Sequence, residues 1–176
     1  MNPRAVTLGV AVSACVASIH GCTRDPDVAG GAEARRAAAG SDPAFAAVQT
    51  RGREAMGVDQ YTSTHLFQPL QDGGRIELQR DVADSAGRAQ ILAHMGEIAL
   101  AFAAGEFTLP GFVHARELPG TKVMAARRAE ISYTVESLPR GAALRLRTAD
   151  SSALAAIHEF LAFQRMDHRA GMRHGE

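Results

Sequence analysis

The order strand, strand, helix occurs twice along this chain, and that duplication constrains the fold more than any other feature. In the first copy, hydrophobic and polar residues alternate over 62–67 and 75–79, on either side of the turn-forming run Gln71-Asp72-Gly73-Gly74. Ala83-Asp84-Ser85 then offers a helix cap, and Gly105 ends the helix. Apolar residues at helical spacing mark its buried side: Ile91, Met95, Ile98 and Phe102.

The second copy repeats this order with little residue identity to the first. Alternation recurs over 131–135 and 144–146, on either side of Pro139-Arg140-Gly141, and Asp150 or Ser151 offers the next helix cap. The helical stripe of this copy consists of Leu154, Ile157 and Leu161. Each copy therefore predicts a β-hairpin followed by an amphipathic helix.

Two such units can share one sheet. A ββαββα chain closes as a four-stranded antiparallel sheet with both helices on one face, which buries every apolar stripe in two layers. We therefore predict an α+β fold made of two ββα units. Between the units, residues 105–122 contain two Leu-Pro-Gly sequences and are expected to form a loop, and residues 123–129 a short helix.

The first 22 residues have the pattern of an export signal. Arg4 precedes an apolar run over 5–19, which is too short to read as a spanning helix. The sequence Ile19-His20-Gly21-Cys22 resembles the lipobox of bacterial lipoproteins, which implies a signal peptide over 1–21 and a lipid on Cys22. Val12-Ser13-Ala14-Cys15 is a rival lipobox, but polar residues begin directly after Cys22 and not after Cys15. We expect an exported protein, anchored to the membrane through Cys22 on the periplasmic side.

Composition constrains the rest of the chain, beyond the signal. Residues 22–41, rich in Ala and Gly, are expected to form the lipidated cysteine and a disordered tether, and residues 42–176 a single domain. The 19 basic and 19 acidic residues balance, so nucleic acid is not an expected partner. Both cysteines lie in the signal region, so no disulfide is expected in the domain.

Three segments resemble a family of small bacterial proteins that has no established activity: 55–60, 101–107 and 157–164. The resemblance spans residues 51–170. It implies one domain and no mechanism.

Histidines are the main functional lead, because imidazole is the commonest protein ligand of transition metals. His65 lies on the predicted first strand, and His94 and His158 lie at similar depths in the two predicted helices. If the units pack as proposed, these three side chains converge on a site for zinc or copper. The alternative is that each histidine bonds to a backbone carbonyl or reaches water.

The C-terminus carries a second metal lead. Met166 and His168 form a Met-x-His unit, and Met172 and His174 repeat it. Thioether and imidazole together favour Cu(I). The alternative is a packed Met166 followed by a frayed tail.

The predicted loop between the two units contains His114 after two apolar residues. His114 either lines a pocket or lies exposed on the surface. Asp59 and Gln60, just before the first strand, either cap a turn or line the same pocket.

The sequence favours a binding protein over an enzyme. The domain has no cysteine and no Gly-x-Ser-x-Gly elbow, and an enzyme would need His114 or His94 as a general base. We predict a lipid-anchored envelope protein whose domain binds a protein or small-molecule partner without catalysis and without a cofactor. The alternative is a histidine and methionine protein that handles copper or zinc.

Overall fold

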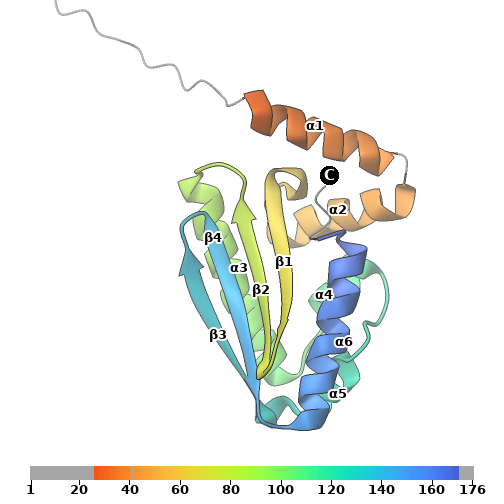
Figure 1. Cartoon of the computed structure of the whole chain (residues 1–176), viewed down its shortest axis with the longest axis vertical. Coiled ribbons are helices and arrows are strands. Elements are labelled where there is room, and N and C mark those ends of the chain that lie inside the picture. The colour runs from red at the N-terminus through yellow and green to blue at the C-terminus, as the bar shows by residue number, and fades with distance from the viewer. Residues whose placement is uncertain (1–25, 41, 171–176) are drawn as a thin grey trace, which may run out of the picture.

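The strand, strand, helix order predicted from the sequence occurs twice in the structure (Figure 1). The computed structural model describes residues 26–40 and 42–170. Its helices are α1 (Pro26–Gly40), α2 (Pro43–Met56), α3 (Ser85–Ala104), α4 (Thr108–His114), α5 (Thr121–Ala126) and α6 (Ser151–Asp167), and its strands are β1 (Ser63–Leu70), β2 (Gly73–Arg80), β3 (Ile131–Leu138) and β4 (Gly141–Thr148). Short 3₁₀ turns, η1 (Gln60–Thr62) and η2 (Arg128–Glu130), precede β1 and β3.

The strands form one antiparallel sheet in the order β1-β2-β4-β3. Each hairpin supplies one neighbouring pair, β1 with β2 and β3 with β4. β2 also pairs with β4, so the two units join at the centre of the sheet, where Ile76 lies opposite Leu144. The predicted α+β fold with a four-stranded antiparallel sheet is confirmed.

One face of the sheet carries the core. Ile76 of β2 and Leu144 of β4 are buried on this face, and alternate residues of each strand share it. α3 covers the half made by β3 and β4, and α6 covers the half made by β1 and β2. The two helices meet where the ring centroids of Phe102 and Phe160 are 5.9 Å apart. Both helices therefore cover one face, as predicted.

Side-chain caps fix where the two long helices begin. Asp84 accepts a hydrogen bond from the backbone N–H of Gly87 at 2.9 Å, and Asp150 accepts one from Ala153 at 2.7 Å. Each satisfies an N–H that has no partner inside its helix. Gly105 ends α3 in the left-handed conformation, at φ 82°. The sequence predicted the stop at Gly105, a cap within 83–85, and a cap at Asp150 or Ser151, of which Asp150 is the one used.

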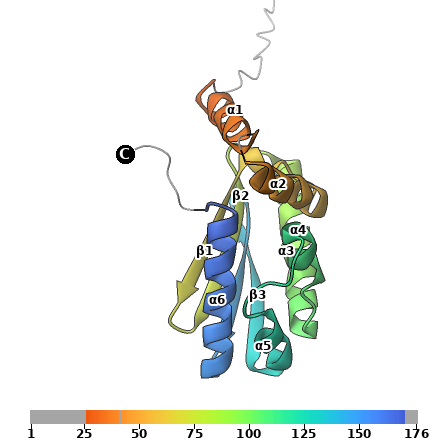
Figure 2. The same ribbon diagram turned by 90° about the vertical axis from the view of Figure 1, so that its right-hand side faces the viewer.

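The ends of the sheet are covered differently. α1 and α2 lie at one end and α5 at the other, as Figure 2 shows. Asp42 caps α2 by accepting from the backbone of Ala44 and Phe45, and Gly57 ends it at φ 70°. α2 was not predicted, although its end brings Met56 and the following turn η1 beside the core.

Helix α1 replaces most of the disordered tether predicted over 22–41. It contacts η1 through two arginines: Arg35 Nε donates to the carbonyl of Tyr61 at 2.9 Å, and Arg36 pairs with Asp59. The prediction weighed only the small apolar area of this segment. Alanine favours a helix even where little area is buried, and the arginines supply polar contacts that composition does not reveal.

The stretch 105–122 is more regular than the predicted loop. It contains α4, and α5 begins at its end; the predicted short helix over 123–129 corresponds to α5 and η2. α4 has no side-chain cap, but Pro110 and Val113 on it are buried. Tertiary packing stabilises this short helix, and a local pattern could not show that packing.

Within residues 26–40 and 42–170, no helix combines the length and the apolar character needed to cross a membrane. The predicted signal peptide lies outside the described residues, as do Cys15, Cys22, Met172 and His174. Export and lipidation at Cys22 therefore stay predictions.

Candidate functional site

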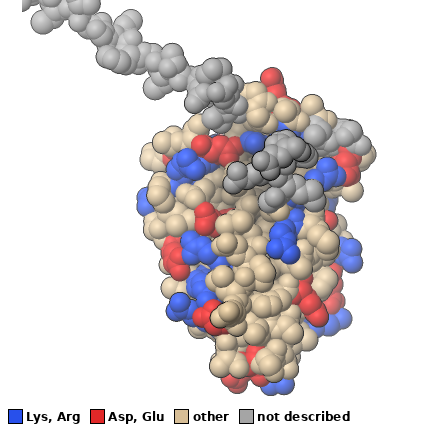
Figure 3. Space-filling model, viewed as in Figure 1, with Lys and Arg blue, Asp and Glu red and all other residues tan. Residues whose placement is uncertain are grey.

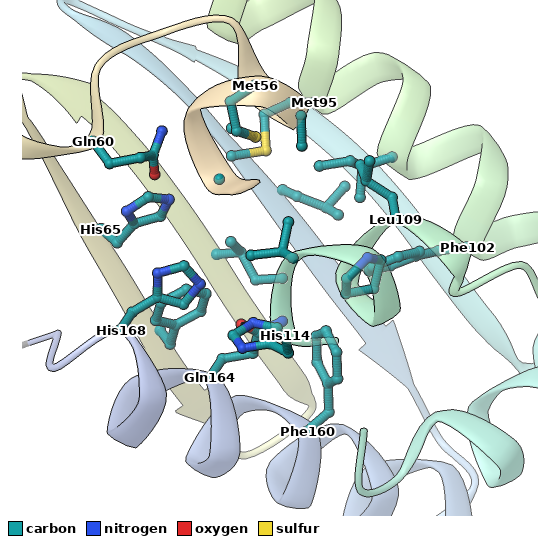
Figure 4. Close-up of a pocket in the computed structure, with 18 residues that line it drawn as sticks. Met56, Gln60, His65, Met95, Phe102, Leu109, His114, Phe160, Gln164 and His168 are labelled. Carbon is teal, nitrogen blue, oxygen red and sulfur yellow. The ribbon is translucent and has the colours of Figure 1, made fainter. Parts of the chain in front are cut away.

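A cavity lies between the core face of the sheet and helices α2, α3, α4 and α6 (Figure 4). Its volume is about 80 Å³. A single buried water needs only about 10–15 Å³. The cavity therefore has room for a small ligand.

Most of the lining is apolar and comes from every layer of the fold. The helices supply methionine, phenylalanine and aliphatic side chains, and the sheet supplies three more hydrophobic residues. These residues are Ala55, Met56, Phe67, Ile76, Met95, Ile98, Phe102, Leu109, Pro110, Val113, Leu144 and Phe160. Methionine side chains are flexible and polarisable, so such a lining adapts to an apolar guest.

Five polar side chains line one side of the cavity, and we call them the polar wall: Gln60, His65, His168, His114 and Gln164. In Figure 4 they follow one another from Gln60 at one end to His114 and Gln164 at the other, across from Met95 and Phe102. They come from η1, β1, α4, α6 and the C-cap of α6. The site is therefore two-sided, with an apolar body and a polar edge.

His114 is bonded at both ring nitrogens. Its Nδ1 faces the Asp167 carboxylate within hydrogen-bond distance, and its Nε2 lies 2.7 Å from Oε1 of the Gln164 amide. Only 1% of its side chain is exposed. The carboxylate fixes the ring orientation, and the pair ties α4 to α6.

His65 and His168 face each other across the middle of the wall. Their ring centroids are 4.8 Å apart, and His168 is also 5.0 Å from His114. Burial, with a smaller contribution from His114, lowers the pKa of His65 from 6.5 to about 4. Burial also holds the pKa of His168 well below its ordinary value, and the neighbouring histidines add to that effect. Both imidazoles are therefore neutral near pH 7.

Gln60 forms the other end of the wall. Its Nε2 donates to the carbonyl of Val58 at 3.0 Å. Its Oε1 is buried and has no hydrogen-bond partner among the described residues, and the same is true of Nδ1 of His168. Buried polar atoms are seldom left without a partner, so these two atoms mark the part of the cavity that can bond to a polar group from outside the chain.

Of the two interpretations of His114, the pocket interpretation is confirmed, because 7% of the residue is exposed and it lines the cavity. For Asp59 and Gln60 the alternatives were to cap a turn or to line the pocket, and each holds for one of the two residues. Asp59 caps η1 by accepting from the backbone N–H of Tyr61 at 2.9 Å, and Gln60 lines the cavity.

The structure does not bring His65, His94 and His158 together. Nε2 of His158 donates to the carbonyls of Leu70 and Gly73, at 2.9 and 3.0 Å, beside the first hairpin turn. His94 lies beside Glu97 on α3, with 3.4 Å between Nδ1 and Oε2, and does not line the cavity. The expected convergence failed because the pattern gave the depth of each helix residue but not its direction around the helix axis.

No group of three or more His, Cys, Asp or Glu in the described part of the chain is placed to hold a metal ion. The first Met-x-His unit is also divided: Met166 is 66% exposed, whereas His168 turns into the polar wall. Asp167 between them bonds to His114.

Sequence reasoning did not identify Gln164 or Asp167 as site residues. A signal for Gln164 was present, because it continues the buried stripe of α6 three residues after Leu161 and yet is polar. Asp167 gave no such signal, since its role depends on α4 lying against the end of α6.

Comparison with protein-family models, curated proteins and solved structures gives no match to this chain. The resemblance over residues 51–170 therefore stays a prediction, and the functional argument depends on the cavity.

Proposed function

We propose that this protein is an exported, lipid-anchored binding protein whose domain holds a small and mostly apolar ligand in the cavity beside the polar wall. One observation carries the proposal: an apolar cavity of about 80 Å³ in the core, with polar side chains gathered on one side. Concave apolar sites with a few convergent polar groups are the usual form of small-molecule sites.

Two further features bear on how a ligand would be held. His114 is held by Asp167 and Gln164, so its bonds serve the architecture of the site. On the face shown in Figure 3, acidic and basic side chains are interspersed, which favours recognition inside the cavity over recognition by surface charge.

Ligand binding is tested with a small neutral amphiphile, n-octanol, titrated by calorimetry into the full chain carrying Cys22→Ala so that no attached lipid competes. Ala55 lines the cavity from α2, and Ala55→Leu places a larger side chain inside it. We expect this variant to weaken probe binding by about ten-fold or more, because volume lost from a packed cavity excludes its guest.

The control is Ala44→Leu, which makes the same change at an exposed position of the same helix. Probe affinity equal in the two variants, with both folded by thermal unfolding, would refute the cavity as the binding site.

The anchor is tested separately in cells. Cys22→Ala is expected to move the protein from the membrane fraction to the soluble envelope fraction, because a membrane-bound lipid needs its attachment point. Retention of the variant in the membrane fraction would contradict anchoring through Cys22 and leave the binding proposal intact.

A further inference from the structure

The amide oxygen of Gln60 is a buried acceptor at the edge of an apolar cavity. Gln60 is 6% exposed, and its Oε1 has no partner among the described residues. Figure 4 shows this oxygen on the side of the amide that faces His65, along the polar wall. A buried carbonyl without a hydrogen bond costs free energy that a suitable ligand group would restore.

A flip of the Gln60 side-chain amide would not give its oxygen a hydrogen-bond partner. Its Nε2 donates to the carbonyl of Val58 at 3.0 Å, and exchanging the two amide atoms would set oxygen against oxygen. The side chain is also confined by α2, because a Cβ added at Gly52 would lie 3.3 Å from Gln60. The wall therefore presents an acceptor at this point and requires a donor from the ligand.

A second buried atom of the polar wall also lacks a hydrogen-bond partner among the described residues. This atom is Nδ1 of His168. A neutral imidazole can donate or accept at this nitrogen, according to its tautomer. A hydroxyl group suits either case, because it both donates and accepts.

The surroundings do not favour a charged head group. The residues that line the cavity include neither Lys nor Arg. Burial keeps His65 and His168 neutral near pH 7. A carboxylate placed against Oε1 of Gln60 would add a second acceptor and lose its own hydration without compensation.

We infer that the ligand is a neutral amphiphile with an apolar body and a hydroxyl head, and that the hydroxyl donates to Gln60 Oε1. The inference rests on the proposed binding function and names the ligand class of that same cavity.

Three probes of similar size separate the possibilities. n-Octanol has a donor and an acceptor, heptyl methyl ether has the same number of non-hydrogen atoms but only an acceptor, and octanoate is an anion. Each is titrated by calorimetry at pH 7 into the full chain carrying Cys22→Ala. We expect n-octanol to bind about ten-fold more tightly than the ether, and octanoate no more tightly than the ether.

The variant Gln60→Met keeps the length of the side chain and removes the acceptor. It is expected to reduce the ratio of octanol to ether affinity to about one while both still bind. The ratio in the unmodified site tests the inference even if this variant fails to fold.

The outcomes are distinct. Equal affinity for alcohol and ether, or tighter binding of octanoate, overturns the hydroxyl inference and leaves the cavity as a binding site. Absence of binding by all three probes overturns the proposed function itself.

Discussion

The two ends of the polar wall are buried to the same degree but bonded differently. His114 is 7% exposed and Gln60 is 6% exposed. His114 is engaged by Asp167 and Gln164, whereas Gln60 and His168 each keep a buried atom with no partner among the described residues. Burial therefore does not separate the two ends, and hydrogen bonding does.

The difference indicates that the two parts of the polar wall have different roles. A hydrogen-bonded network that joins two helices makes the fold rigid, so the end at His114 fixes α4 against α6. An unsatisfied group lowers stability and is retained where function needs it. We therefore expect the part of the wall at Gln60 and His168 to contribute little to stability, and under the proposed function it is the part that meets the ligand.

The largest expected effect is on the pH dependence of stability. The pKa of His65 falls from 6.5 to about 4 on folding, so between these values the unfolded chain binds a proton that the folded chain excludes. The free energy of unfolding is complete above pH 6.5 and decreases as the pH falls toward 4. From His65 alone the loss is about 3 kcal/mol, and the lowered pKa of His168 acts in the same direction. This loss is measured by urea unfolding at pH values from about 7.5 to about 4, the range in which histidines titrate.

His65→Leu is the control, because it removes the titrating group and places an apolar side chain against Phe67. We expect a flatter profile, in which the remaining slope comes from His168. The carboxylates with lowered pKa, such as that of Asp84, titrate below their ordinary value and so outside this window. An unchanged profile in the variant would show that His65 is not held neutral by the fold.

The next effect is on stability at the bonded end. His114→Leu removes both hydrogen bonds and leaves Gln164 and Asp167 without their buried partner. We expect a loss of about 2 kcal/mol in the free energy of unfolding, measured by urea unfolding at pH 7. His65→Leu serves here too: its loss should be smaller, because no hydrogen bond joins His65 to another described residue. Equal losses would remove the distinction between the ends.

Much of the fold could be predicted because its signals are local. The caps at Asp84 and Asp150, the stop at Gly105 and the two turns each depend on neighbours a few residues away. α1 and α4 escaped prediction because they depend on distant partners, such as the contact of Arg35 with Tyr61.

The site was predicted only in part, for a related reason. His65 and His114 were chosen as candidates and do line the cavity, but His94 and His158 do not. A helical pattern shows which residues share a stripe, whereas a site needs the direction of each side chain around the axis and the register of one helix against another.

The smallest expected effect is on stability at the open end, and it tests the comparison most directly. Gln60→Met loses the hydrogen bond to Val58 and also removes the buried Oε1 that has no partner. These changes offset each other, so the free energy of unfolding should change by less than about 1 kcal/mol, as measured by urea unfolding at pH 7. If the free energy of unfolding fell as much as in His114→Leu, Gln60 would support the fold. Its Oε1 without a partner would then no longer indicate a ligand.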